Sequence, residues 1–219
     1  MGVLFLLIFI SALPVIAAFL WFRRRQFPTP TLWFLLCLLA GVLSLSLAAV
    51  AQYIMPPAKG VAMKDILFNV FIRIALVEEG SKLLIVLIIL QISGKLLKMR
   101  KKDGDNFTYG TAAGLIAGLG FAMIESASYG ASDMRIAVLR AFTAAPLHGA
   151  CGARDGSAAD LLKTDPRLAI WRFLSATAIH GAYNMLVVSP GHIQFLSVLL
   201  SFTSLLSATR LLYKKEKVS

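Results

Sequence analysis

Three charged residues interrupt one long apolar stretch of this sequence. Residues 74–90 read IALVEEGSKLLIVLIIL, a segment long enough to cross a bilayer, and they contain Glu78, Glu79 and Lys82. One charged side chain at the bilayer centre costs about 2.5–3.5 kcal/mol on insertion scales, so these residues must face other helices or water. Lys82 follows the two glutamates at helical spacing and can pair with either carboxylate. A simple ion pair needs one glutamate, and the second is then left for another task.

Three later apolar segments carry further polar groups. The notable residues are Phe121 and Glu125 in GLGFAMIES, Arg140 and His148 in RAFTAAPLHGA, and His180 and Asn184 in SATAIHGAYNML. Either histidine, taken alone, is more often a hydrogen-bonded packing residue. Taken together at membrane depth, these acids, imidazoles and amides predict one polar site shared by four segments.

Such a site suits the hydrolysis of a peptide bond by an activated water molecule. A carboxylate beside a neutral imidazole can hold a water molecule and take its proton. A second donor, such as Asn184 or a histidine, can stabilise the oxyanion of a tetrahedral intermediate. Glutamate and histidine also bind zinc, which lowers the pKa of bound water to about 7. The HExxH pattern is absent, so a metal would need ligands from several helices.

The composition places these residues in an integral membrane protein. The chain has 219 residues, of which 58% are apolar, and its mean hydropathy is +0.77. Its net charge of +11 does not indicate a nucleic-acid partner, because the basic residues lie in short segments between apolar runs. Cys37 and Cys151 fall in or beside apolar segments, and we expect them to be buried thiols. The expected surroundings are the lipid bilayer.

The apolar runs predict an all-α, polytopic bundle that forms one membrane domain over residues 1–219. Seven spans are expected, at about 2–22, 31–55, 65–92, 107–129, 134–152, 171–189 and 192–212. With seven spans and the N-terminus outside, 16 of the 22 basic residues lie on the cytoplasmic side, as the positive-inside rule requires. These are Arg23–Arg25; Lys95, Lys98, Arg100, Lys101 and Lys102; Arg154, Lys163, Arg167 and Arg172; and Arg210, Lys214, Lys215 and Lys217. The C-terminus is then cytoplasmic.

A column of small residues follows the fourth expected span. Its members recur every four positions: Gly110, Gly114, Gly118, Ala122, Ser126 and Gly130. Small side chains let two membrane helices approach closely. We therefore expect a tightly packed neighbour, which would bring Glu125 close to other helices.

Four motifs in order resemble those of the PrsW family of intramembrane proteases, within the wider group of CAAX prenyl proteases and Abi proteins. EEGSK reads as EExxK, FAMIE as FxxxE and HGAYN as HxxxN, while RAFTAAPLHG supplies an arginine and a Pro-x-His element. The resemblance covers residues 65–190, and the first two spans match only in being hydrophobic. One departure is Ser126, where many relatives are expected to have asparagine.

The resemblance implies cleavage of a single-pass membrane protein, such as an anti-sigma factor, by a multi-pass enzyme of the cell membrane. It makes Glu78 and Glu79 the water-activating pair, completed by Glu125 and His148. It assigns His180 and Asn184 to binding water or the oxyanion, while Lys82, Phe121 and Arg140 support the site. We expect a metal-free glutamate mechanism, and zinc held by Glu79, Glu125, His148 and His180 is the alternative.

Other functions remain open at this point. A CAAX-type prenyl-peptide protease would use the same residues. A proton-coupled carrier would also place Glu, His and Lys inside the membrane, although no inverted repeat or pair of broken helices is evident. A non-catalytic scaffold would use the polar site to bind partner helices. Loss of cleavage on replacing Glu79 separates the proteases from the last two.

Overall fold

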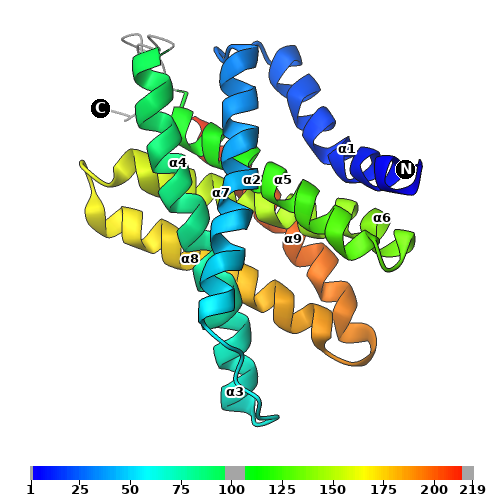
Figure 1. The fold of residues 1–219 in the computed structure, drawn as a ribbon. Helices are drawn as coiled ribbons and strands as arrows, with labels where there is room; N and C mark the ends of the chain where they lie inside the picture. Colours follow the sequence, from blue (N-terminus) through cyan, green and yellow to red (C-terminus); the bar gives the residue numbers. More distant parts are fainter. Residues whose placement is uncertain (1, 97–106, 214–219) are drawn as a thin grey trace.

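The computed structural model describes residues 2–96 and 107–213, and these fold into helices without a β-strand (Figure 1). The elements are α1 (Gly2–Arg24), α2 (Thr31–Ile54), α3 (Met63–Leu67), η1 (Phe68–Leu76), α4 (Val77–Leu96), α5 (Tyr109–Gly130), α6 (Met134–Phe142), α7 (Ala144–Leu161), α8 (Pro166–Val188), η2 (Gly191–Gln194), α9 (Phe195–Thr209) and η3 (Arg210–Leu212). The expected all-α class is confirmed.

Within the described ranges, four helical segments are long and apolar enough to cross a membrane, and a bent pair makes a fifth. The four are Phe5–Arg24, Thr31–Ile54, Tyr109–Gly130 and Gly191–Leu212, and the pair is α6 with α7. The other two expected spans correspond to α3–α4 and to α8, where ionisable residues lower the apolar character of the helix. These two helices are not apolar enough to count as spans by length and composition. The count of seven spans and the orientation therefore stay predictions.

The fifth expected span, 134–152, is wrong in its bounds. It consists of two helices that meet at an angle of 44°, and the second continues to Leu161. Arg154, which we expected in a cytoplasmic loop, is therefore inside α7 and buried. Its guanidinium donates to the carbonyl oxygen of Ser204 at 3.3 Å and to the hydroxyl of Ser207, so it joins α7 to α9.

Several expected cytoplasmic residues lie outside the part of the chain that the structure describes. They are Lys98, Arg100, Lys101, Lys102, Lys214, Lys215 and Lys217. Arg23–Arg25 and Lys95 are exposed at the C-terminal ends of α1 and α4. The two cysteines are buried free thiols, as expected.

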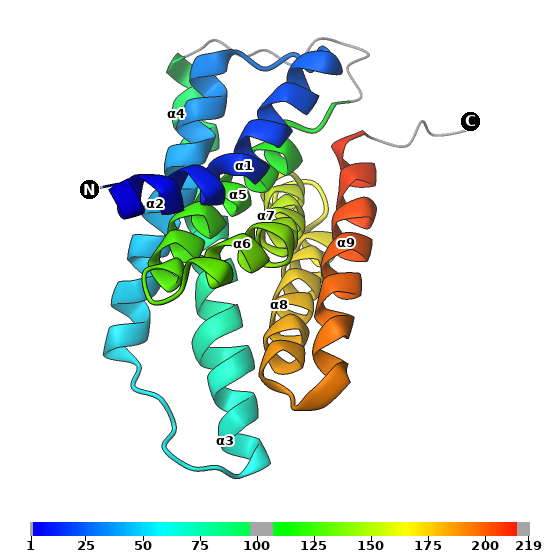
Figure 2. The ribbon, with the colours of Figure 1, turned by 90° about the vertical axis from the view of Figure 1, so that its right-hand side faces the viewer.

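The bundle has three layers, with α5 and α7 in the middle (Figure 2). Helices α2 and α4 lie on one side of this central pair, and α8 and α9 lie on the other. The small-residue column of α5 meets a second column on α7, and a Cβ added to Gly114 or Gly152 would overlap backbone atoms of the opposite helix. The expected close approach is confirmed, and it fixes the distance between Glu125 and His148, one on each helix.

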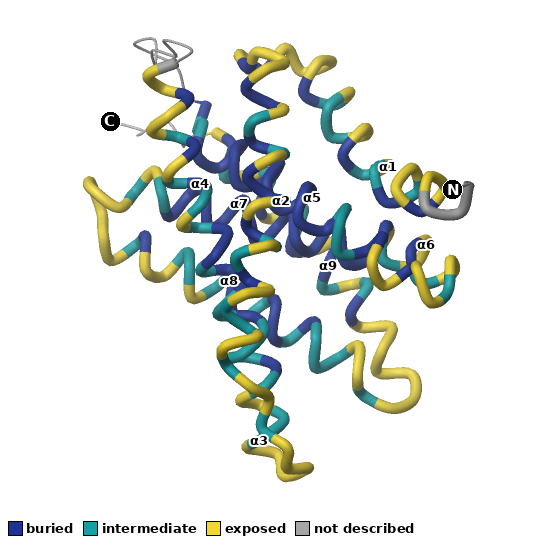
Figure 3. The backbone as a smooth tube through the Cα atoms, in the orientation of Figure 1, coloured by how far each residue is buried: buried dark blue, intermediate teal, exposed yellow. Residues whose placement is uncertain are grey.

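The outer helices differ from this centre in what they expose. Large apolar side chains of α1, α2 and α9 are exposed, including Phe9, Leu20, Leu35 and Leu199. The tube in Figure 3 shows exposed stretches along α1 and α2, whereas the central helices are mostly buried. Such a surface suits contact with lipid. Between α1, α5, α7 and α9 lies an apolar cavity of about 330 Å³, and no acid or histidine of the predicted site lines it.

Candidate functional site

The site begins at a change of helical geometry. Residues Phe68–Leu76 form a π-helical stretch that passes directly into α4 at Val77. Helical segments of this wider type recur at functional sites. The first turn of α4 then presents Glu78 and Glu79 toward the bundle interior, where both are buried.

Lys82 pairs with only one of the two glutamates. Its Nζ lies 2.6 Å from Oε1 of Glu79, and both side chains are fully buried. Glu78 instead accepts a hydrogen bond of 3.1 Å from Nε2 of Gln52, which is on α2. The ion pair that the spacing predicts is therefore confirmed for Glu79, and Glu78 is the glutamate left for another task.

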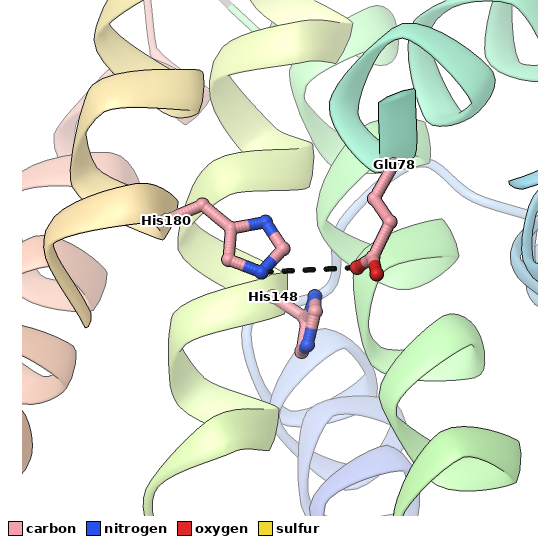
Figure 4. Close-up of side chains that lie close together, drawn as sticks. All are labelled: Glu78, His148 and His180. Atoms are coloured by element: carbon pink, nitrogen blue, oxygen red, sulfur yellow. Dashed lines mark ion pairs between the residues drawn. The ribbon is translucent and has the colours of Figure 1, made fainter. Parts of the chain in front are cut away.

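His180 on α8 links the two glutamates, and Figure 4 shows it facing Glu78. Its Nδ1 hydrogen-bonds to Oε1 of Glu79, and its Nε2 lies 3.7 Å from Oε2 of Glu78. Because a carboxylate accepts, Nδ1 carries a proton, and in the neutral imidazole Nε2 then keeps its lone pair. Oε2 of Glu78 is buried and has no hydrogen-bond partner among the described residues. Two electron-rich atoms therefore face each other without a donor between them.

His148 on α7 connects Lys82 to Glu125 on α5. Its Nε2 lies 2.9 Å from Oε2 of Glu125, and its Nδ1 lies 3.4 Å from Nζ of Lys82. Since the lysine ammonium can only donate, Nδ1 accepts and Nε2–H donates to Glu125. Phe121 packs on His148 and Lys82: its ring centre is 5.0 Å from the imidazole centre and 5.0 Å from the ammonium nitrogen. The aromatic residue thus holds both groups in place.

Glu125 and Arg140 form the outer end of the cluster. Nη2 of Arg140, on α6, lies 2.5 Å from Oε2 of Glu125. Their side chains are 15% and 17% exposed, whereas those of Glu78, Glu79, Lys82, His148 and His180 are exposed by 8% or less. The expected convergence of Glu125 and His148 is confirmed. A continuous series of polar contacts runs inward from Arg140 to Gln52.

Asn184 is the predicted site residue without a contact to the others. It is partly buried on α8, one turn after His180, and among the described residues its side chain makes no hydrogen bond. The contacts described above join the other predicted residues: Glu78, Glu79, Lys82, Phe121, Glu125, Arg140, His148 and His180. The catalytic roles assigned to these residues stay predictions.

Sequence reasoning missed two members of the cluster. Gln52 is one amide near the end of an apolar helix, and Asp155 is fully buried on α7, two turns after His148. The signal for Gln52 was present, because it is the last polar residue of the predicted second span. Asp155 was hidden because its segment, ARDG, resembles a surface loop.

Three residues fit the coordination of a metal ion. Ligand atoms of Glu78, His148 and His180 all lie within 4.8 Å of one another. The unpartnered oxygen of Glu78 and the lone pair of His180 Nε2 are the kind of donors that zinc uses. The carboxylate of Glu79 behind His180 gives the carboxylate–histidine arrangement common behind metal ligands. This group differs from the predicted set, because Glu79 and Glu125 are already bonded to Lys82, Arg140 and the histidines.

Comparison with known proteins gives the chain a family. The family model described as PrsW family intramembrane metalloprotease matches residues 28–208, which include α2 and every helix of the cluster. No curated protein and no solved structure matches the chain. Since the family match covers far more than half of the 219 residues, the chain belongs to the PrsW family of intramembrane metalloproteases.

Proposed function

We propose that this protein hydrolyses a peptide bond of a membrane-tethered protein within the bilayer. Family membership supports intramembrane proteolysis as its activity. The observation that carries the proposal is the facing pair of Glu78 Oε2 and His180 Nε2, 3.7 Å apart and buried among membrane helices. Two acceptors without a donor suit a water molecule or a cation, and either one can activate water for attack on a carbonyl.

The surrounding residues have distinct roles in this proposal. Glu79 holds the imidazole of His180 so that Nε2 points at Glu78, and Lys82 balances the charge of Glu79. His148 and Glu125 hold a proton between them at Nε2 of the imidazole, one hydrogen bond from the partly exposed end of the cluster. In a metal-free form, this pair would pass a proton to the leaving amine, and Glu78 would be the base nearest to the attacking water.

We favour a metal-dependent form of this site over the metal-free form that the sequence suggested. Glu78, His148 and His180 would hold the ion, and His148 would give up one present contact to do so. A bound divalent ion would supply Lewis acidity and a water molecule of lowered pKa. Zinc suits this mixture of imidazole and carboxylate ligands.

The proposed substrate is a single-pass membrane protein, such as an anti-sigma factor, and a prenylated CAAX-type peptide is the second candidate. The order of the motifs supports a relation to the wider group of CAAX prenyl proteases and Abi proteins. We propose seven spans, an outside N-terminus and location in the plasma or inner membrane. The C-terminal ends of α1 and α4, with Arg23–Arg25 and Lys95, lie together at one end of the bundle (Figure 2), which supports this orientation.

The test compares membrane-protein fragments from cells that express the wild type, Glu78→Gln or Asp133→Asn at equal levels. Asp133 is a matched acid-to-amide control, because it lies outside the cluster at the start of α6. Mass spectrometry should find fragments ending near a membrane boundary with the wild type and the control. With Glu78→Gln their yield should fall by about 10²–10⁴-fold, the range for loss of a general base. Equal yields from Glu78→Gln would contradict the proposal.

A second arm tests the metal. Purified enzyme is treated with a chelator, dialysed and then given back zinc, and cleavage of a substrate found in the first arm is followed. We expect loss of cleavage and recovery with zinc. Unchanged cleavage, with no metal detected by elemental analysis, would restore the metal-free glutamate mechanism.

A further inference from the structure

Asp155 is a buried acid that the proposed mechanism does not use. It lies on α7, and its exposed fraction is 0%. Neither carboxyl oxygen has a hydrogen-bond donor among the described residues. A buried polar group normally has a partner, because leaving it unpaired costs its full desolvation energy. This side chain therefore needs an explanation.

The neighbouring cations are committed elsewhere. Arg154, the next residue, donates to the carbonyls of Ala150 and Ser204 and to the hydroxyl of Ser207. Lys82 is close enough to interact with Asp155, but its ammonium is bonded to Glu79 at 2.6 Å and approaches His148 at 3.4 Å. No described cation donates a hydrogen bond to the Asp155 carboxyl.

The group that Asp155 faces is Glu79. The two carboxyl groups are within hydrogen-bonding reach of each other. Oε1 of Glu79 is occupied by Lys82 and His180, while Oε2 is buried and has no donor in the described part of the chain. Two buried carboxyl groups face each other, and the oxygens left over on both lack a hydrogen. One proton on Asp155 satisfies both residues at once, because a protonated carboxyl group donates and a carboxylate accepts.

We propose that Asp155 is a positioning residue that donates a hydrogen bond from its neutral carboxyl group to Glu79. The Glu79 carboxylate is then held from two sides: by Lys82 and His180 at one oxygen and by Asp155 at the other. Its grip on Nδ1 of His180 fixes the direction of Nε2 toward Glu78. Asp155 acts through Glu79 and touches no reacting atom, and its catalytic effect rests on the proposed function.

Two substitutions that keep the branched arrangement of side-chain heavy atoms separate donation from packing. Asp155→Asn keeps an N–H donor for Glu79, whereas Asp155→Leu fills the space without one. We expect kcat to stay within about threefold of the wild type for Asp155→Asn, and to fall about 10–100-fold for Asp155→Leu, the usual cost of losing an outer-shell partner. KM should not change in either variant. A loss in Asp155→Asn equal to that in Asp155→Leu would overturn the donor role.

A spectroscopic measurement tests the hydrogen bond without any substrate. Infrared spectra of the purified protein should contain the C=O stretching band of a protonated carboxylic acid that is absent from Asp155→Asn. The same band should move in Glu79→Gln, which changes its partner, and should persist in Glu78→Gln. A spectrum of Asp155→Asn that retains every such band would overturn the proposal.

The two measurements also distinguish this inference from the proposed function. If the assigned band is present but the wild type releases no fragments, the hydrogen bond stands and the protease assignment fails. If the wild type cleaves its substrate and the band is absent, the protease assignment stands and the donor role of Asp155 fails. Thermal unfolding of Asp155→Asn and Asp155→Leu in detergent shows whether the variants are folded in either case.

Discussion

Helices α5 and α1 show that burial in this bundle follows side-chain size rather than hydrophobicity. In the apolar window of α5, 83% of the residues are buried, against 22% in α1, although α1 is the more hydrophobic helix. Glycine and alanine allow α5 to contact α7, whereas the leucines and phenylalanines of α1 face outward. In lipid, large apolar side chains gain little by turning inward, so close packing decides which helix becomes the centre. The polar cluster lies on that centre.

Enlarging a glycine of the central pair should break the bundle. In Gly152→Leu the new side chain would overlap the backbone of α5 at Gly114, so the two helices must separate. We expect destabilisation of more than about 4 kcal/mol, seen as loss of the folded fraction in a melting experiment in detergent. Gly94→Leu is the matched control, because no described atom beyond the adjoining backbone of its own helix lies within 4 Å of the position of its Cβ. Equal effects of the two substitutions would refute the packing argument.

Truncating a leucine should have opposite consequences in the two regions. Leu147 on α7 is 0% exposed and Leu20 on α1 is 53% exposed. Leu147→Ala leaves a cavity and should cost about 2–5 kcal/mol of unfolding free energy, measured by denaturant titration in micelles. Leu20→Ala loses mainly contact with lipid and should change stability by no more than ~0.5 kcal/mol. A larger cost at Leu20 would show that α1 is packed against something other than lipid.

Removing the arginine that joins α7 to α9 should have a smaller effect than the glycine and leucine substitutions of the central helices. Arg154→Gln removes the guanidinium that bonds to Ser204 and Ser207, and the expected loss is about 1–3 kcal/mol in the same titration. Arg167→Gln serves as the control, because Arg167 is exposed at the start of α8. If both variants lose the same free energy of unfolding, the hydrogen bonds of Arg154 to Ser204 and Ser207 add no stability.

The smallest effect is expected at the start of α6, outside the cluster. Asp133 accepts from the side chain and backbone N–H of Arg135, which lowers the pKa of the Asp133 carboxyl. A lowered pKa in the folded state stabilises the protein above the ordinary pKa of aspartate, and this stability disappears as the pH falls through the lowered value. Asp133→Ala should lower the melting temperature by about 2 °C at pH 7. The difference from the wild type should vanish in strong acid, and its persistence there would argue against the carboxylate.

Much of the site could be predicted from the sequence, because polar residues in apolar segments are conspicuous. Glu78, Glu125, His148 and His180 stood out in this way, and the structure brings them together. Which residue each of them contacts was harder to predict from the sequence. Spacing allowed Lys82 to pair with either glutamate, and only the rotation of α4 against α2 and α7 decides for Glu79.

The predicted bounds of the fifth span were wrong for a related reason. The α7 segment that contains Arg154 and Asp155 is rich in glycine and charge, which in a sequence indicates a loop. In the bundle those glycines are what allows α5 to touch α7, and the charged residues are buried. Asp155 was missed for the same reason, because its segment was taken for a loop. Asn184 lies one turn after His180 on the same helix, and its role in binding water or the oxyanion stays a prediction.

The glycine contacts also tie the polar cluster to the packing of the central helices. The backbone carbonyl of His148 occupies the space where a side chain at Gly118 would be, so a residue of the cluster is itself part of the contact between α5 and α7. These helices cannot slide apart without disrupting the His148–Glu125 pair. Helix α8 also packs on η1, where the ring of Phe71 lies against Gly181. A shift of η1 against α8 would change the distance between Glu78 and His180 and leave the contact between α5 and α7 in place.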